Sequence, residues 1–413
     1  MKILVVTESI NIEDSSGSKA NVALIHNLVE AGFEVLVYHY TREDIHLKGV
    51  NCFSIPEIKY SFLYFLSRFQ RVLQRNTNIN ASPFLEKLFG FSFTFFNDSN
   101  SIIKVLRKST FQPDLILTLS KGASFRPHYA VLKLPQLHNK WMAYVHDPYP
   151  FHYYPRPYTW VEGGYQFKND FFIEVSKKAK YSAFPSLLLK EWMGSFFSHF
   201  LETGVVIPHQ NSNYHIQNHH LPNYFDATKF NLLHAGYLLS QRYPQGLLEG
   251  FKLFLEKNPE ARKEARLFFL GNAIDHAQLL EDYTISIPEI YVQNRNIPFD
   301  EVYFMQQKAS VNIILEAKSE ISPFLPGKFP HCVEANKVLL SLAPYYSEVR
   351  RLLGNDYEYW SEVDDVEKIA KLIEKLYRLW KQNPDNLLLN RNDLEEYLSV
   401  SYLQKVITNL KFN

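Results

Sequence analysis

A turn followed by a helix, at residues 322–337, gathers the residue types that hold an anionic ligand. The stretch reads SPFLPGKFPHCVEANK, in which Pro326 and Gly327 predict a tight turn and a helix is expected from Phe329 onward. Backbone N–H groups at the start of a helix stabilise negative charge, and Lys328 adds a full positive charge there. The segment therefore predicts an anion site, although a Pro-Gly turn beside an ordinary packed helix would have the same sequence.

A second candidate group is the His146–Asp147 pair, which closes the stretch KWMAYVHD at residues 140–147. The apolar residues of this stretch predict a strand, so His146 is expected where that strand reaches its carboxyl end. There Asp147 would orient the imidazole through a ring nitrogen. A His-Asp pair that only caps the end of a strand is the alternative interpretation.

Composition and charge exclude several classes of protein. The chain has 413 residues, which fits two domains, and 44 Lys and Arg residues balance 43 Asp and Glu residues. This balance provides no field to attract nucleic acid, so we expect no nucleic-acid partner. Cys52 and Cys332 form no disulfide framework and suit a reducing compartment. The N-terminus has no signal peptide and no apolar run reaches ~18 residues, so we expect a cytoplasmic protein.

The elements that must position these residues alternate between strands and helices. Ile3–Val6 is typical of a buried strand, and Ala20–Ala31 has the apolar spacing of a helix that ends at Gly32. A second strand follows at 33–40, and this order predicts a parallel sheet with a right-handed crossover. Further elements of this half are expected as strands at 113–120, 140–147 and 202–209 and as a helix at 187–197.

The same pattern begins again after the polar segment 208–228, which we interpret as a linker. Strands are expected at 230–239, 265–272, 288–296, 309–317 and 337–344, and helices at 245–259, 363–382 and 392–411. The fold class is therefore α/β, with two doubly wound Rossmann-like domains at 1–207 and 229–390 that face a crevice. Residues 391–413 form a C-terminal helix that could cross back to the first domain. Ligands of such sheets bind beyond the carboxyl ends of the strands.

The segment SPFLPGKFPHCVEANKVLLSLAP resembles the pattern SP-x-x-LP-x-K-x-x-EY-x-x-x-GKP-[IV]-L of family 4 glycosyltransferases, which have the GT-B fold. The resemblance extends over most of the chain and takes in KILVVTES…SGS, WMAYVHDPY, AFPSLLLKEWM and LLHAGYLLSQRYPQGLLEGFKLFLEKNP. It implies a C-terminal domain that binds a nucleotide-sugar, and an N-terminal domain that presents the acceptor.

The resemblance also implies which residues bind the donor. They lie in a glycine loop near the N-terminus, a strand end with a basic loop, and the Pro-Gly-Lys turn, and they are Gly17, Gly236, Arg242, Pro326, Gly327 and Lys328. The chain departs from the family pattern at three positions. His331 replaces the glutamate that holds the ribose, Gln245 replaces a lysine, and Asn336 replaces a glycine. Glu334, one helical turn after His331, could supply the missing carboxylate.

By the same resemblance His146 is catalytic and lies beside the transferred sugar. It would hydrogen-bond a hydroxyl or help to stabilise the oxocarbenium-like state, with Asp147 as its partner. The proline-rich segment that follows carries aromatic side chains whose faces suit the C–H faces of a sugar. We expect acceptor contacts from Tyr149, Tyr153, Tyr154 and Trp160, while aromatic packing over a loop is the alternative.

Segment 59–75 predicts a basic amphipathic helix, because it contains Lys59, Arg68, Arg71 and Arg75 and no acid. Such a helix either docks on an anionic bilayer, as in family members with lipid-linked acceptors, or packs on its own domain. His215 and His219 have the spacing of zinc ligands on a helix, but the Asn- and Pro-rich surroundings do not favour a metal site.

These observations favour a glycosyltransferase that moves a sugar from a UDP- or GDP-sugar to a carbohydrate or lipid-linked glycan. The family implies retention of anomeric configuration, no metal, no cofactor and a role in surface polysaccharide or glycan assembly. It also implies a cytoplasmic protein that could work at the inner face of the membrane. The alternative is a degenerate GT-B protein that serves as a binding or scaffold partner, which the changes at His331, Gln245 and Asn336 would fit. A sugar epimerase would need further carboxylates, and none is clearly positioned.

Overall fold

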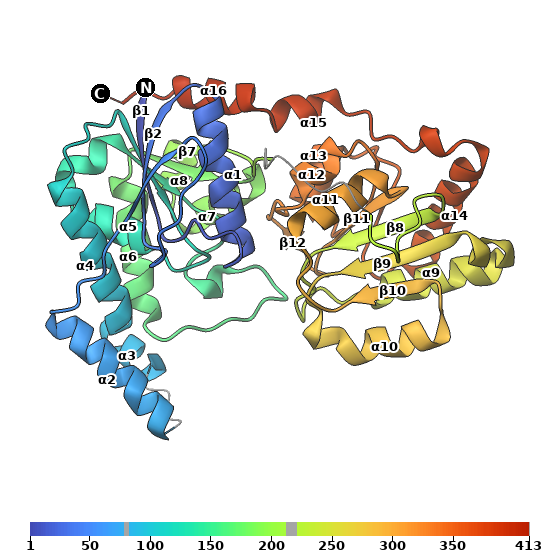
Figure 1. Ribbon diagram of the computed structural model, residues 1–413, viewed down its shortest axis with the longest axis horizontal. Helices are drawn as coiled ribbons and strands as arrows, with labels where there is room; N and C mark the ends of the chain where they lie inside the picture. The colour runs from blue at the N-terminus through green and yellow to red at the C-terminus, as the bar shows by residue number, and fades with distance from the viewer. Residues whose placement is uncertain (78–81, 212–220, 413) are drawn as a thin grey trace. The chain divides into compact units, whose positions relative to one another are not determined.

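The computed structural model describes residues 1–77, 82–211 and 221–412, which form two compact units (Figure 1). Unit 1 contains residues 1–154, 159–213 and 398–413. Unit 2 contains residues 155–158 and 214–397. Each unit has its own parallel sheet and its own hydrophobic core.

Unit 1 is built on a seven-stranded sheet with the strand order β3-β2-β1-β4-β5-β6-β7, in which every pairing is parallel. The strands are β1 Lys2–Thr7, β2 Glu34–His39, β3 Asn51–Ser54, β4 Leu115–Leu119, β5 Trp141–Tyr144, β6 Tyr181–Phe184 and β7 Gly204–Val206. All residues of β4 and β5 are buried, as expected for central strands covered by helices on both faces. The parallel sheet predicted from the sequence is confirmed.

The helices of unit 1 include two that lie away from its sheet. These two are α2 and α3, which follow one another at one end of the unit (Figure 1). The helices are α1 Ser16–Glu30, α2 Phe62–Thr77, α3 Ser82–Phe89, α4 Phe93–Lys108, α5 Arg126–Leu132, α6 Tyr165–Lys178, α7 Leu187–Phe196, α8 His199–Thr203 and α16 Val400–Thr408. Short 3₁₀ helices lie at Pro135–Lys140 and Phe151–Tyr153.

Helix α1 begins four residues before the predicted start at Ala20. Its N-cap is Ser15, whose hydroxyl accepts a hydrogen bond from the backbone N–H of Ser18 at 3.1 Å. The predicted end at Gly32 is confirmed, because this glycine has a φ of 85° and its N–H bonds to the carbonyl of Val29.

The C-terminal segment forms two helices instead of the single predicted helix at 392–411. Helix α15 spans Asn392–Tyr397, and the hydroxyl of Ser399 then caps α16 by accepting a hydrogen bond from the N–H of Tyr402. Helix α16 packs beside α1 within unit 1 (Figure 1), where Gln404 Nε2 donates to the carbonyl oxygen of Ala31 at 2.7 Å.

Unit 2 is built on a six-stranded parallel sheet with the order β10-β9-β8-β11-β13-β15. The strands are β8 Phe230–Ala235, β9 Ala265–Leu270, β10 Ile290–Gln293, β11 Val311–Leu315, β13 Val338–Leu342 and β15 Trp360–Ser361, with a separate parallel pair formed by β12 Ile321–Ser322 and β14 Tyr346–Ser347. The remaining helices are α9 Gln245–Lys257, α10 Ala277–Ser286, α11 Phe299–Lys308, α12 Phe329–Glu334, α13 Glu348–Leu353 and α14 Val366–Gln382.

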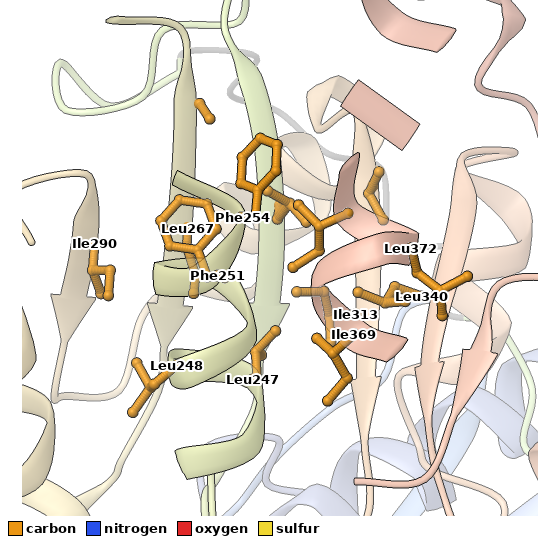
Figure 2. Close-up of a cluster of buried hydrophobic side chains, with 14 of the residues drawn as sticks. Leu247, Leu248, Phe251, Phe254, Leu267, Ile290, Ile313, Leu340, Ile369 and Leu372 are labelled. Carbon is orange, nitrogen blue, oxygen red and sulfur yellow. The ribbon is translucent and has the colours of Figure 1, made fainter. Parts of the chain in front are cut away.

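The core of unit 2 lies between its sheet and the helices α9 and α14 (Figure 2). Phe251 of α9 and Ile369 of α14 are fully buried against strand residues such as Ile313. The two helices touch at Gly250, where an added Cβ would lie 2.6 Å from a methyl carbon of Ile369. Each large side chain buried here stabilises the unit by about 1.5–3 kcal/mol, so the sheet is a rigid support for the loops at its edge.

Candidate functional site

Two glycines with positive φ lie at the carboxyl edge of the sheet in unit 2. Gly236 follows β8 with a φ of 136°, and Gly271 follows β9 with a φ of 124°. No heavy atom lies within 4 Å of an added Cβ on Gly236, so the backbone faces open space at this point. Gly236 therefore occupies a position where a main chain can approach a ligand.

Two cations predicted to bind the donor lie in one electrostatic cluster at this edge. Lys328 Nζ donates to the carbonyl oxygen of Ile313 at 3.0 Å. Burial, with a smaller contribution from the nearby Arg242 guanidinium, lowers the pKa of the Lys328 ammonium to about 7. The guanidinium of Arg242 bonds the carbonyl oxygen of Tyr237 at 3.4 Å. Arg242 and Lys328 are separated by 86 positions in the sequence, and the fold brings their charges together.

The same cluster contains two residues that the sequence analysis missed, Glu316 and His234. Glu316 follows β11, is 4% exposed, and has a carboxyl pKa raised to about 7 by burial. The hydroxyl of Ser322 and the charge of Arg242 oppose this rise. Burial holds the pKa of His234, in β8, well below its usual range, and Lys328 and Arg242 reinforce that effect. An acid at the end of an otherwise apolar strand was the available signal for Glu316.

The Pro-Gly turn and the helix after it have the predicted positions. The N–H of Phe329 bonds to the carbonyl of Pro326 at 2.9 Å, which closes the turn through Gly327, and α12 starts at Phe329. Helix α12 has only six residues, so its dipole is short.

His331 and Glu334 project from one face of α12, as their spacing predicted. The distance between His331 Nδ1 and Glu334 Oε2 is 3.7 Å. The His331 ring packs edge-on against Phe299 and Tyr303 of α11, with centroid distances of 5.1 and 5.8 Å. The His331 imidazole therefore lies in a largely aromatic setting with one carboxylate, that of Glu334, beside it.

Asn336, which stands where the pattern in the sequence analysis has a glycine, has a left-handed backbone conformation. Its φ is 50°, in the left-handed region that asparagine tolerates better than most residues. The Asn336 side chain also accepts a hydrogen bond from the N–H of Asn390 at 2.9 Å. The asparagine is therefore compatible with a left-handed turn at this position and ties it to Asn390.

In unit 1, Gly17 lies in the first turn of α1 rather than in the preceding loop. The reason is the Ser15 cap, which starts the helix early. An added Cβ on Gly17 would lie 3.5 Å from the backbone nitrogen of Gly122, which follows β4. This is an ordinary van der Waals distance, so the two segments lie side by side at the carboxyl edge of the sheet without a steric need for glycine.

His146 follows β5 and is buried, but the structure corrects its expected partner. Its Nε2 lies 2.9 Å from Asn21 Oδ1 of α1, and its Nδ1 has no hydrogen-bond partner among the described residues. Neither ring nitrogen of His146 is hydrogen-bonded to Asp147, so the predicted orientation of the imidazole by Asp147 is wrong. The ring of His209, after β7, lies parallel to that of His146 with centroids 6.0 Å apart.

Two of the four aromatic residues expected to contact an acceptor are packed into unit 1 instead. Tyr149 is 2% exposed, and its ring packs on Phe125 and Phe172 at 4.8 and 4.7 Å. Tyr153 stacks on Phe196 at 4.0 Å, and its hydroxyl bonds Asn169. The sequence could not separate these core aromatics from exposed ones, because the loop has no periodic pattern.

The other two, Tyr154 and Trp160, form a half-buried pair with centroids 4.5 Å apart. The loop that carries them is held by Lys168 of α6, whose Nζ lies 2.9 Å from both Glu162 and Glu86. Glu162 also accepts a hydrogen bond from the N–H of Phe151 at 2.9 Å. Because Glu86 belongs to α3, one buried ammonium links the aromatic loop to that helix.

Helix α2 carries an exposed aromatic face. Phe62, Phe65 and Phe69 are 77%, 61% and 67% exposed. The opposite face packs against α4, and Arg71 there bonds Thr94. The predicted amphipathic helix is therefore present, and packing on its own unit leaves its aromatic stripe uncovered by the described residues.

The fold was compared with known proteins. No protein-family model and no curated protein matches the sequence. HepE of Anabaena, solved with UDP and glucose, is 10% identical with a TM-score of 0.60 and covers 99% of this chain and 98% of its own. The UDP-forming α,α-trehalose-phosphate synthase of Burkholderia xenovorans is 12% identical with a TM-score of 0.62 over 98% and 97% of the two chains. The E. coli trehalose-6-phosphate structure with UDP-2-fluoro glucose is 12% identical with a TM-score of 0.59 over 99% and 98%.

The chain has the GT-B fold.

The GT-B architecture predicted from the sequence, with two Rossmann-like units built on parallel sheets, is thereby confirmed. Within the described residues, no group of three or more His, Cys, Asp or Glu side chains could hold a metal ion. His215 and His219 lie outside the described residues. Among the helices of the described chain, none is long and apolar enough to cross a membrane.

One further feature of this GT-B chain that the sequence analysis missed is an ionic network beside the sheet of unit 1. Glu8 follows β1 and accepts hydrogen bonds from the N–H groups of Lys121 and Arg126 at 2.9 and 3.0 Å. The Arg126 side chain continues to Asp98 at 3.1 Å, and Asp98 pairs with Arg42 at 2.9 Å. Ion pairs between residues so far apart in sequence leave no local pattern.

Proposed function

We propose that this chain is a glycosyltransferase that moves a sugar from a nucleoside-diphosphate-sugar to an acceptor hydroxyl. The observation that carries the proposal is the pair of cations, Arg242 and Lys328, at the carboxyl edge of the sheet in unit 2. Arg242 bonds the carbonyl oxygen of Tyr237, the residue after Gly236, and at Gly236 the backbone is open to a ligand. A leaving diphosphate needs such charges, because negative charge develops on it as the bond to the sugar breaks.

We infer that the donor is a uridine nucleotide rather than a guanosine nucleotide. Support comes from the similar structures, since HepE was solved with UDP and glucose and the E. coli protein with UDP-2-fluoro glucose. The family resemblance adds that transfer retains the anomeric configuration and needs no metal. It also favours surface polysaccharide or glycan assembly as the setting.

Recognition of the donor ribose is assigned in this proposal to Glu334, with His331 beside it. A carboxylate accepts hydrogen bonds from two hydroxyls, which is the task of the glutamate that His331 replaces. The Glu334 side chain is exposed, and its carboxylate lies 3.7 Å from the imidazole of His331. Glu334→Gln should then weaken UDP binding about 10-fold, a typical cost for a hydrogen bond to a charged group. Equal affinity in the variant would remove Glu334 from the site.

Calorimetric titration with UDP-glucose and GDP-glucose in the absence of divalent metal tests the donor assignment. The expected result is saturable binding of UDP-glucose that Lys328→Ala removes, together with slow release of glucose when no acceptor is present. Binding of neither nucleotide at millimolar concentration would favour the alternative of a GT-B scaffold that has lost its donor site.

For the acceptor, we propose that Tyr154 and Trp160 contact a carbohydrate or lipid-linked glycan at unit 1. The exposed stripe of Phe62, Phe65 and Phe69 would rest on the inner face of the membrane. An anionic bilayer is the occupant that the charges favour, since Lys59 and Arg75 are exposed near the ends of α2.

Sedimentation with vesicles tests the membrane contact. Vesicles with anionic lipid should bind the chain, and a triple Phe→Ser variant at 62, 65 and 69 should lose most of that binding. A matched triple variant of exposed apolar residues of unit 2, Ile274→Ser, Ile285→Ser and Tyr243→Ser, should keep it. Equal binding of both variants would refute the contact through α2.

A further inference from the structure

Asn21 connects three strand ends in unit 1 from its position in the first half of α1. The side chain is fully buried. Its Nδ2 donates to the carbonyl oxygen of Ser120, after β4, at 3.0 Å and reaches Thr7 Oγ1, at the end of β1, at 3.4 Å. Its Oδ1 lies 2.9 Å from Nε2 of His146, after β5. A buried polar residue with this many partners has a defined orientation.

The contacts of the amide determine which end of Asn21 faces the imidazole. A carbonyl oxygen accepts hydrogen bonds and cannot donate, so the group that faces Ser120 O must be the NH₂ of Asn21. The remaining atom, Oδ1, is likewise only an acceptor. The atom it contacts, His146 Nε2, must therefore carry a hydrogen.

The other ring nitrogen of His146 is then an acceptor. The imidazole is buried, and burial together with His209 and His128 holds its pKa well below the usual range, so the ring is neutral and carries one hydrogen. Since that hydrogen is on Nε2, Nδ1 presents a lone pair. It has no hydrogen-bond partner among the described residues, and a buried acceptor without a partner is costly.

We propose that Asn21 is a positioning residue that fixes His146 as the Nε2–H tautomer, so that Nδ1 accepts a hydrogen bond from a hydroxyl group of a sugar substrate. This inference rests on the proposed function for the identity of the ligand. The tautomer itself is a property of unit 1 alone. His146 is in this way a hydrogen-bond acceptor for its substrate and not a proton donor.

Nitrogen-15 NMR of the histidine rings in the full chain, without any substrate, tests the tautomer directly. The His146 signals are identified by their loss in His146→Gln. The expected result is a protonated Nε2 and an unprotonated Nδ1 that stay unchanged from pH 6 to pH 8. A ring with hydrogen on Nδ1, or one that takes up a proton in this range, would overturn the inference.

Substitutions at Asn21 test its role, with Asn27→Ala as the matched control. Asn27 is a buried amide on the same helix, but it bonds the carbonyl oxygens of Ala23 and Asn211 and not His146. Asn21→Leu should produce a mixture of His146 tautomers and reduce kcat for glycosyl transfer at least about 10-fold, a typical loss for a mispositioned catalytic group. Asn27→Ala should leave the His146 signals unchanged and kcat within about 2-fold of wild type, because its contacts do not reach the ring.

Asn21→Asp provides a second variant of nearly the same size, in case Asn21→Leu does not fold. The carboxylate still accepts from Nε2 but adds a negative charge, so the pKa of His146 should rise and activity should fall on the acid side of the pH profile as Nδ1 becomes protonated. An unchanged pH profile in a folded Asn21→Asp protein would overturn the inference. Absence of any turnover by the wild type would overturn the proposed function, and with it the sugar ligand, while the NMR result still decides the tautomer.

Discussion

A Cβ atom added to Gly271 would lie 2.7 Å from the carbonyl oxygen of Gly236. The loops that follow β8 and β9 therefore touch backbone to backbone at the carboxyl edge of unit 2, with no side chain between them. Both glycines also have φ values that other residues rarely adopt. The shape of the proposed diphosphate site thus depends on two positions that contribute no functional group.

Gly271→Ala should destabilise unit 2 by at least about 1–3 kcal/mol, the usual cost of a strained backbone, because it adds a steric conflict to an unfavourable φ. Gly236→Ala should cost a similar amount through its φ alone. The matched control is Gly327→Ala, where an added Cβ meets nothing within 4 Å and φ is not positive. Free energies of unfolding from urea titrations provide the measurement, and a Gly271→Ala protein as stable as Gly327→Ala would contradict the close contact.

Lys328→Ala should weaken binding of UDP about 10- to 100-fold, the usual value of a hydrogen bond to a charged group. The control is Lys257→Ala in the same unit, which removes an exposed lysine that pairs with Glu367. Isothermal titration calorimetry measures both. If the two variants bound UDP equally well, Lys328 would have no part in donor binding.

Binding of UDP-glucose should weaken as the pH rises through 7. The pKa of Lys328 is lowered to about 7, so its ammonium is charged below this pH and neutral above it. The pKa of Glu316 is raised to about 7, so its carboxyl is neutral below this pH and negative above it. Both changes make the site less attractive to a diphosphate at higher pH, and each can contribute up to about 10-fold per pH unit above the pKa.

The diphosphate of UDP-glucose does not titrate in this range, so dissociation constants at pH 6 and pH 8.5 report on the protein groups. Arginine remains charged at all these values. In Lys328→Arg the dependence should therefore shrink to the part caused by Glu316, and in Glu316→Gln it should shrink to the part caused by Lys328. A flat pH profile in the wild type would show that neither group titrates beside the diphosphate.

Asp98→Ala should destabilise unit 1 by about 3 kcal/mol, because it removes the buried partner of two arginines. Asp98 lies 2.9 Å from Arg42 and 3.1 Å from Arg126, and it also accepts from the hydroxyl of Tyr40 at 2.9 Å. Glu34→Ala is the control in the same unit, since it breaks only the exposed pair with Lys2 and should cost at most about 1 kcal/mol. Thermal unfolding measures the loss of stability in both variants. Equal losses would show that the ionic network around Asp98 contributes nothing.

Most of the sheet was predictable because buried parallel strands are short apolar runs that end in polar residues or glycine. The strand that becomes β11 and the turn at Pro326 carry their own local signals. The start of α1 was missed because the Ser15 cap stands in a serine-rich loop that offers several caps. The C-terminal break at Ser399 was missed for the same reason, since serine is both a cap and an ordinary helix residue.

The sequence named the charged residues of the candidate site, but it missed the residues whose role depends on burial. Arg242 and Lys328 were named from the resemblance, with a solvated loop cation and an ordinary turn as the alternatives, and the fold places both in one cluster. Glu316 and Asn21 were missed because burial decides their chemistry, and burial depends on elements far away in the chain. Tyr149 was misassigned for the converse reason, since an aromatic residue suits a sugar and a hydrophobic core equally well.

The link made by Lys168 has a mechanical consequence. Its ammonium is buried between Glu86 of α3 and Glu162 of the aromatic loop, and removal of either carboxylate would leave a buried charge with half of its compensation. The backbone reinforces the link, because an added Cβ on Gly164 would collide with the carbonyl oxygen of Glu86. We therefore expect a displacement of α3 at the surface to be transmitted to the loop that carries Tyr154 and Trp160.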